Sequence, residues 1–296
     1  MTTRIPHGLA VLATLAFAHT SFLHTAAAET PLERGAYLMN GIVACGNCHT
    51  PQGPDGPLPG MELAGGLRME DAPFTAHTSN LTPDAKTGLG RWSDAEIVTA
   101  IREGRRPDGR LIGPPMPVEF YRGISDGDAM AIVAYLRQVK AVENPVPKSE
   151  YRMPLPPSWG PPVGSVPEVP RTDPVKYGEY LAGPLGHCME CHTPRLADGR
   201  LDRTRWGAGG MPFPGPWGVS VSRNLTSDPE DGLGKWTDSQ IKTAITTGVR
   251  PDGTRLAPPM AFHFYKTIRD EDLTALVAYL RTLPPLKSPV AMGASK

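Results

Sequence analysis

The feature that most constrains this chain is an internal duplication. The segment Ser79–Ile101 (SNLTPDAKTGLGRWSDAEIVTAI) matches Arg223–Ile245 (RNLTSDPEDGLGKWTDSQIKTAI) almost residue for residue. Within it, Trp92 and Trp236 lie 144 residues apart, and beyond it Met116 and Met260, and Tyr135 and Tyr279, have the same separation. Solenoid repeats run about 20 to 50 residues, so this longer period indicates a duplicated domain instead.

Proline marks the boundary between the two copies. The chain of 296 residues contains 34 Pro and 32 Gly, and prolines are dense between the repeats. We predict a first domain at residues 29–143, an extended Pro-rich linker at 144–172 and a second domain at 173–290. The linker is either a plain tether or a strap packed on both domains with Trp159 as its anchor.

Each copy is predicted to contain three helices and long Gly/Pro-rich loops, which makes the fold class all-α. Ser93 with Glu96, and Thr237 with Gln240, have the spacing of a capping box and predict where the middle helices begin. The other helices are expected at Glu33–Gly41, Val175–Gly183, Asp128–Val139 and Leu273–Leu283. The regions between CxxCH and NLT are expected to be loop, with a short hairpin at most.

The N-terminus has the pattern of a secretory signal peptide at residues 1–28. Arg4 supplies the basic start, Gly8–Ala18 is mostly apolar, and the small residues at 26–28 form a cleavage site. We expect cleavage and export to the periplasm, with no transmembrane anchor afterwards; the alternative is an uncleaved membrane anchor. Lys plus Arg equal Asp plus Glu at 30 each, which argues against a nucleic-acid partner.

All 4 cysteines fall in two C-x-x-C-H units, CGNCH at residues 45–49 and CMECH at residues 188–192. A zinc site needs four ligands at one point, and each copy offers only three. A dithiol redox centre is expected in a βαβ setting, and a local disulfide leaves the histidine without a role. Covalent haem c uses every residue of the motif: Cys45, Cys48, Cys188 and Cys191 as attachment points, and His49 and His192 as iron ligands.

Methionine is the predicted second axial ligand of each iron. Met116 and Met260 are repeat counterparts, and both follow a Pro-Pro pair that restricts the loop. The rival histidines lack a counterpart in the other copy and are predicted to be incidental: His77, His187 and His263. We therefore predict two His/Met-ligated haems in one chain.

With these motifs the sequence resembles the di-haem class I cytochromes c, which have two tandem cytochrome c domains. The stretch NLTxDxxxGLGxW, which begins at Asn80 and at Asn224, is similar to cytochrome subunits of periplasmic dehydrogenases. The resemblance implies that the first and third helices of each domain cross, with Gly35 near Tyr135 and Gly178 near Tyr279. It also implies a place near the haem propionates for the two asparagines and for Trp92 and Trp236.

Two filled axial positions leave no open iron, so we expect an electron carrier rather than an enzyme. The expected partners are a dehydrogenase as donor and an oxidase or another cytochrome as acceptor. One alternative is a di-haem redox enzyme, peroxidase-like or acting on sulfur compounds, with one displaceable axial ligand. Another is a subunit of a membrane oxidase, which requires an uncleaved N-terminus.

Overall fold

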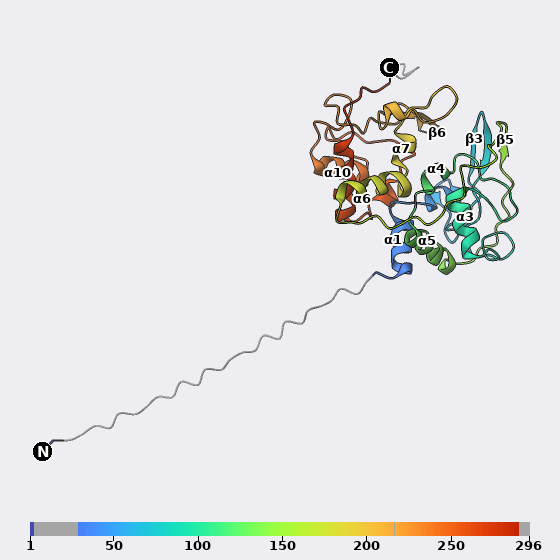
Figure 1. Ribbon diagram of the computed structural model, residues 1–296, viewed down its shortest axis with the longest axis horizontal. Helices are drawn as coiled ribbons and strands as arrows, with labels where there is room; N and C mark the ends of the chain where they lie inside the picture. The colour runs from blue at the N-terminus through green and yellow to red at the C-terminus, as the bar shows by residue number, and fades with distance from the viewer. Residues whose placement is uncertain (3–28, 216, 290–296) are drawn as a thin grey trace.

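The structure of the chain is a computed structural model that describes residues 1–2, 29–215 and 217–289 (Figure 1). Apart from its first two residues, the predicted signal peptide lies outside this part of the chain. Among the described residues, no helix has both the length and the apolar character needed to cross a bilayer.

The same order of helices recurs in the two halves of the chain. The first half contains α1 (Pro31–Asn40), α2 (Gly46–His49), α3 (Asp94–Glu103), α4 (Val118–Tyr121) and α5 (Asp126–Gln138). The second half contains α6 (Pro174–Tyr180), α7 (Cys188–Cys191), α8 (Asp238–Thr247), α9 (Phe262–Tyr265) and α10 (Asp270–Thr282). A π-helical turn, η1 (Leu181–Leu185), continues α6, and a short 3₁₀ turn, η2 (Arg203–Arg205), follows α7.

The capping residues begin the middle helices as predicted. Ser93 accepts from the Glu96 N–H while the Glu96 carboxylate accepts from the Ser93 N–H at 2.7 Å. Thr237 and Gln240 repeat this capping box at the start of α8. Both pairs satisfy backbone N–H groups that the first helical turn leaves free.

The fold class needs one correction, because the protein is mostly helical but also contains small antiparallel sheets. The strands are β1 (Gln52–Gly53), β2 (Gly56–Pro57), β3 (Arg68–Asp71), β4 (Phe74–His77), β5 (Glu150–Tyr151), β6 (Pro212–Gly215) and β7 (Gly218–Val221). The pairs β3–β4 and β6–β7 are hairpins between CxxCH and NLT, and β5 joins β4 as a third strand. Strands of two to four residues are too short to show an alternating sequence pattern.

The first and last helices of each half, α1 with α5 and α6 with α10, cross at a glycine, as the resemblance implied for the first and third predicted helices. A Cβ on Gly35 would lie 2.0 Å from the Ala131 carbonyl oxygen and 3.0 Å from Tyr135 Cβ. A Cβ on Gly178 would lie 1.9 Å from the Ala275 oxygen and 2.8 Å from Tyr279 Cβ. Glycine is therefore required at both crossings because the partner backbone occupies the space of a side chain.

The Pro-rich linker is a strap rather than a plain tether. Trp159 donates its indole N–H to the Ile112 carbonyl at 2.9 Å, which confirms it as an anchor. Further along, Glu168 accepts from the Ser125 hydroxyl at 2.9 Å, and Arg171 lies 3.3 Å from Asp272 in α10. The strap thus contacts both halves.

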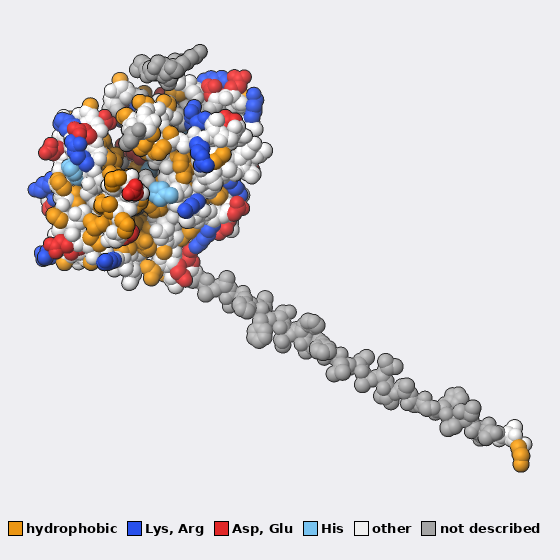
Figure 2. Space-filling model, turned by 180° about the vertical axis from the view of Figure 1, so that it is seen from behind, with side chains coloured by type: hydrophobic (Ala, Val, Ile, Leu, Met, Phe, Trp, Pro, Cys, Tyr) orange, Lys and Arg blue, Asp and Glu red, His pale blue; other side chains and the backbone are white. Residues whose placement is uncertain are grey.

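One hydrophobic cluster runs through the interior and includes buried side chains of both halves, among them Leu38, Ile42, Leu181 and Leu185. The elements of the two halves lie side by side in Figure 1, with α1 next to the second half. On the opposite face, Lys and Arg side chains are interspersed with Asp and Glu, in keeping with the balanced composition (Figure 2).

Candidate functional site

Each C-x-x-C-H unit forms a single helical turn that places its cysteines and histidine together. In α2 the His49 N–H donates to the Cys45 carbonyl at 2.9 Å. In α7 the His192 N–H donates to the Cys188 carbonyl at 3.0 Å. Residues four apart lie on one face of a helix, so the first cysteine and the histidine of each motif share a face.

Both histidine rings are oriented by a backbone carbonyl at an equivalent place. His49 Nδ1 lies 2.8 Å from the Ser79 carbonyl oxygen, and His192 Nδ1 lies 2.6 Å from that of Arg223. An acceptor at Nδ1 places the proton there and leaves Nε2 as the free lone pair. Burial lowers the pKa of both imidazoles, which favours the neutral, metal-binding form.

The four thiols are free and poorly suited to thiol chemistry. None of the four forms a disulfide, although each pair is three residues apart. Burial raises the pKa of Cys45 and Cys191 to about 12 and that of Cys188 to about 11, and it also raises the pKa of Cys48. Reactive cysteines and thiolate ligands have a lowered pKa, so these values argue against a dithiol redox centre.

The NLT motif has a structural explanation. Asn80 donates to the Val142 carbonyl at 2.8 Å and to the Thr87 hydroxyl at 3.0 Å, while its oxygen accepts from Thr82. Asn224 repeats this arrangement with Leu286, Ser288 and Thr226. These bonds hold the NLT loop in place. The residue just before this loop supplies the backbone carbonyl that faces the histidine of the CxxCH motif. They use both amide donors within the chain, and the place near the haem propionates that the resemblance implies for the asparagines stays a prediction.

The two methionines occupy equivalent loops. Met116 and Met260 are partly buried, and their carbonyls accept from the N–H two residues on, at 2.8 Å and 3.1 Å. The Pro-Pro bond before each methionine is cis. The neighbours of the loops differ: Tyr151 of the linker accepts from Gly113 at 3.1 Å, whereas Ser220 of β7 donates to Pro258 at 2.5 Å.

The second half, with its histidine on a helical turn and its glycine crossing, matches a known family. Residues 178–284 match the family described as Cytochrome c. This part of the chain is a cytochrome c domain. The predicted ligands of that domain, His192 and Met260, and its cysteines all lie within the matched residues.

Curated relatives are similar over most of the chain. The cytochrome c subunit of a quinone-type alcohol dehydrogenase of Gluconacetobacter polyoxogenes is 33% identical, covering 88% of this chain and 59% of the relative. The gluconate 2-dehydrogenase cytochrome c subunit of Pantoea cypripedii is 32% identical, covering 92% and 64%. A diheme cytochrome c-type protein of Cereibacter sphaeroides is 29% identical, covering 82% and 83%. The chain thus spans about three fifths of the length of the first two.

The residues of both halves fit a covalently bound haem c. A cytochrome c domain implies this group, and each half brings two free thiols and an imidazole with its Nδ1 occupied onto one helical turn. The names of the relatives, as cytochrome c subunits, agree with the prediction of a cytochrome rather than an enzyme.

The structure assigns contacts to residues that sequence reasoning passed over. The ring of His187 meets the Tyr121 ring of the other half edge-on at 5.7 Å, a packing contact that leaves the prediction that His187 is not an iron ligand untested. Phe264 in α9 lies against Gly46, where a Cβ would be 2.9 Å from its ring. Phe120 and Phe264 are themselves repeat counterparts. In the sequence, that equivalence was the only indication that these two residues make a specific contact.

Proposed function

We propose that this chain is a periplasmic di-haem c-type cytochrome that transfers single electrons. Cys45 and Cys48 would hold one haem, with His49 and Met116 on its iron. The second haem would be held by Cys188 and Cys191, with His192 and Met260 as axial ligands. In this proposal the chain has two tandem cytochrome c domains at residues 29–143 and 173–290, joined by the linker at 144–172.

The observation that carries the proposal is the repeated histidine geometry. In both halves Nδ1 of the motif histidine is engaged by the carbonyl that precedes NLT. This bond fixes the ring plane and increases the basicity of Nε2, the atom that would bind iron. Similarity to a diheme cytochrome supports a count of two.

Bound haem would supply the one-electron chemistry, and the side chains would set its potential and access. Methionine opposite histidine raises the reduction potential. The strap bonds to one methionine loop and β7 to the other, so the surroundings of the two loops differ and the two potentials are expected to differ. No proton transfer by the chain is required.

The proposed donor is a dehydrogenase to which this chain is bound as a subunit or partner, and electrons continue to a respiratory oxidase or another cytochrome. The similarity to cytochrome c subunits of an alcohol dehydrogenase and of gluconate 2-dehydrogenase supports a donor of this class. Purification of the native complex and identification of its companion tests this part, and N-terminal sequencing of the mature chain tests export.

Substitution of the two methionines tests the ligand assignment. Met116→Ala and Met260→Ala should each abolish one of two methionine-type signals in the ferric absorption spectrum and lower the potential of that haem. Met130 on α5 is 45% exposed and provides the control, because Met130→Ala should keep both signals. A variant at 116 or 260 that retained both signals would show that the ligand is another residue.

The haem count and the response to carbon monoxide separate this proposal from its alternative. Two covalent haems per chain, both unreactive towards carbon monoxide when reduced, are expected for a carrier with filled axial positions. Ready binding of carbon monoxide by either ferrous haem would instead favour a redox enzyme with a displaceable ligand.

A further inference from the structure

The strap completes the small sheet of the first half. Its strand β5 adds to the outer edge of β4 as a third strand. Beside this pairing, the Arg152 N–H donates to the Pro73 carbonyl at 2.8 Å and the His77 N–H donates to the Ser149 hydroxyl at 3.0 Å. The edge of β4 is thereby closed, and Thr75 in its centre is only 9% exposed.

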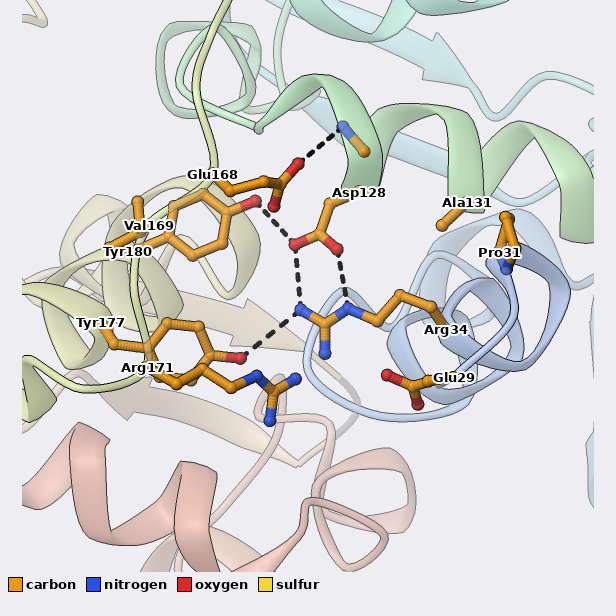
Figure 3. A pocket seen from close by; sticks show the side chains of 11 residues that line it. Glu29, Pro31, Arg34, Asp128, Ala131, Glu168, Val169, Arg171, Tyr177 and Tyr180 are labelled. Carbon is orange, nitrogen blue, oxygen red and sulfur yellow. Dashed lines mark hydrogen bonds and ion pairs between the residues drawn. The ribbon is translucent and has the colours of Figure 1, made fainter. Parts of the chain in front are cut away.

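The strap also covers the first methionine loop. The Tyr151 ring lies so close to Gly113 that a Cβ there would be 2.6 Å from it, and Gly113 is buried. The strap then runs to the boundary between the halves. There Glu168 accepts from a backbone N–H of α5 at 2.8 Å, and the Arg171 guanidinium lies 5.0 Å from the centre of the Tyr177 ring (Figure 3). Its strand and its aromatic side chain therefore serve the first half.

The equivalent surface of the second half is bare. In the described part of the chain, β6 and β7 form a sheet of two strands with no third. Val219, the repeat counterpart of Thr75, is 66% exposed, and Trp217 beside it is 44% exposed. Residues 257–259 of the second methionine loop are also exposed. We call β7, Trp217 and residues 257–259 the β7 surface.

The hydrogen-bonding groups of β7 that face outward can be identified from the hairpin. Ser222 donates its N–H to Met211 and accepts from the Gly210 N–H, both at 2.9 Å, so its backbone faces β6. Successive residues of a strand face opposite ways, so the N–H and C=O groups of Val219 and Val221 point away from β6. Such an edge is a template for another strand.

The side chains at the β7 surface specify what can pair with it. Ala257 takes the place of Gly113, so its Cβ takes up space equivalent to that of the Tyr151 ring in the first half. A strand added to β7 therefore needs a small residue where the strap has Tyr151. Opposite Val219, at the position of Glu150, an apolar residue would cover the exposed side chain.

Two exposed arginines flank the β7 surface in the sequence. Arg223 follows β7 by two residues, and Arg255 lies three residues before Pro258. Their repeat counterparts in the first half, Ser79 and Leu111, are uncharged. Because opposite charges steer partners together and fix their register, this border favours a segment that carries Asp or Glu.

We propose that the β7 surface binds an extended, acidic segment of the dehydrogenase, which adds to β7 as a third strand in the way that β5 adds to β4. This inference rests on the proposed function, because it names the contact surface for the proposed donor. A strand edge beside exposed apolar side chains fits a lasting subunit contact rather than a small transient one. The Ser220 hydroxyl, 2.5 Å from the Pro258 carbonyl, joins β7 to the loop of Met260, so the segment lies against that loop.

The first test measures the affinity of the holoprotein for the dehydrogenase that co-purifies with the native chain. Val219→Pro removes an outward N–H, leaves the bonds to β6 intact and is tolerated at a sheet edge. Loss of this hydrogen bond should raise the Kd by about tenfold or more. Val219→Thr is the matched control, because it keeps the N–H and the branched shape, and its Kd should stay within about threefold of the wild type. An unchanged Kd for Val219→Pro would overturn the inference.

The charge of the segment is tested by Arg255→Glu. This variant should bind more weakly than the wild type, and the difference should shrink as salt is added. Arg91→Glu makes the same charge change at an exposed arginine of the first half and should bind like the wild type. Equal affinity of Arg255→Glu and the wild type at low salt would overturn the acidic character of the segment.

Amide hydrogen exchange of the wild type identifies the occupant without any variant. The N–H groups of Val219 and Val221 should exchange fast in the chain alone and slowly in the complex. Slow exchange in the chain alone that is lost on removal of residues 290–296 would assign the edge to the chain's own C-terminus and overturn the inference. Slow exchange that appears only as the chain is concentrated would assign it to a second copy, with the same consequence. A native chain with no dehydrogenase bound would instead refute the proposed function.

Discussion

Substitution of Gly178 by alanine should drive the two long helices of the second half apart. The Ala275 carbonyl oxygen would lie 1.9 Å from the new Cβ, and the Ala275 carbonyl carbon 2.6 Å from it. Ordinary contacts of carbon with a carbonyl oxygen are about 3.3 Å or longer, so α6 and α10 must separate by more than 1 Å. Because the obstacle is backbone, no side-chain rotation can relieve it.

The expected cost follows from two opposed effects. Overpacking of a well-packed contact costs about 1 to 3 kcal/mol, and a backbone obstacle places this site at the upper end. Alanine favours the helical conformation over glycine by about 1 kcal/mol, which offsets part of this cost. The net loss is about 2 kcal/mol, and at about 2 to 4 °C per kcal/mol the Tm should fall by about 4 to 8 °C.

Thermal unfolding followed by far-ultraviolet circular dichroism measures this loss. Gly183 in η1 provides the matched control, because a Cβ there would have no other atom within 4 Å. Gly183→Ala should stay within about 0.5 kcal/mol of the wild type. If Gly178→Ala and Gly183→Ala melted at the same temperature as the wild type, the tight crossing would not exist in solution.

Two further predictions concern the strap and the NLT loop. Bonds from the Ser165 hydroxyl, Arg102 and the Val166 N–H lower the pKa of Asp126 to about 2, against about 3.9 in an unfolded chain. This carboxylate therefore stabilises the fold above about pH 4 and loses that effect as the pH falls towards 2. Asp126→Asn should lower the Tm at pH 7, and its Tm should fall less steeply than that of the wild type between pH 4 and 2. Parallel curves of Tm against pH for the two proteins would contradict this. Asn224→Ala leaves the Thr226 N–H unpaired and removes the shorter of two hydrogen bonds to the Leu286 carbonyl, so chemical denaturation should show a loss of about 1 to 3 kcal/mol. The exposed Asn40→Ala serves as its control, and equal stability of the two variants would refute the role assigned to Asn224.

Local chemistry explains what could be predicted from the sequence. Ser93 and Thr237 predict helix starts because capping depends on residues three apart, and both capping boxes form. Gly35 and Gly178 follow from the resemblance, and both crossings are confirmed. The roles of the cysteines, Met116 and Met260 remain predictions. A short hairpin was allowed for between CxxCH and NLT, but the number and positions of the strands could not be predicted, because short strands with Gly/Pro turns have no periodic signal.

The sequence by itself determined the helices and the CxxCH motifs, because these depend on residue types at fixed short spacings, and it determined the duplication and the methionine candidates, because the two copies match residue for residue. The tertiary structure alone decided how the two copies meet. Tyr37 and Asp272 are separated by 235 residues, and neither has a local pattern that marks it as half of a pair. Only the fold shows that the same contact recurs between Tyr180 and Asp128. Both aspartates are buried, so each carboxylate needs its hydrogen-bond partners. This burial is likewise a property of the packed halves and not of any segment.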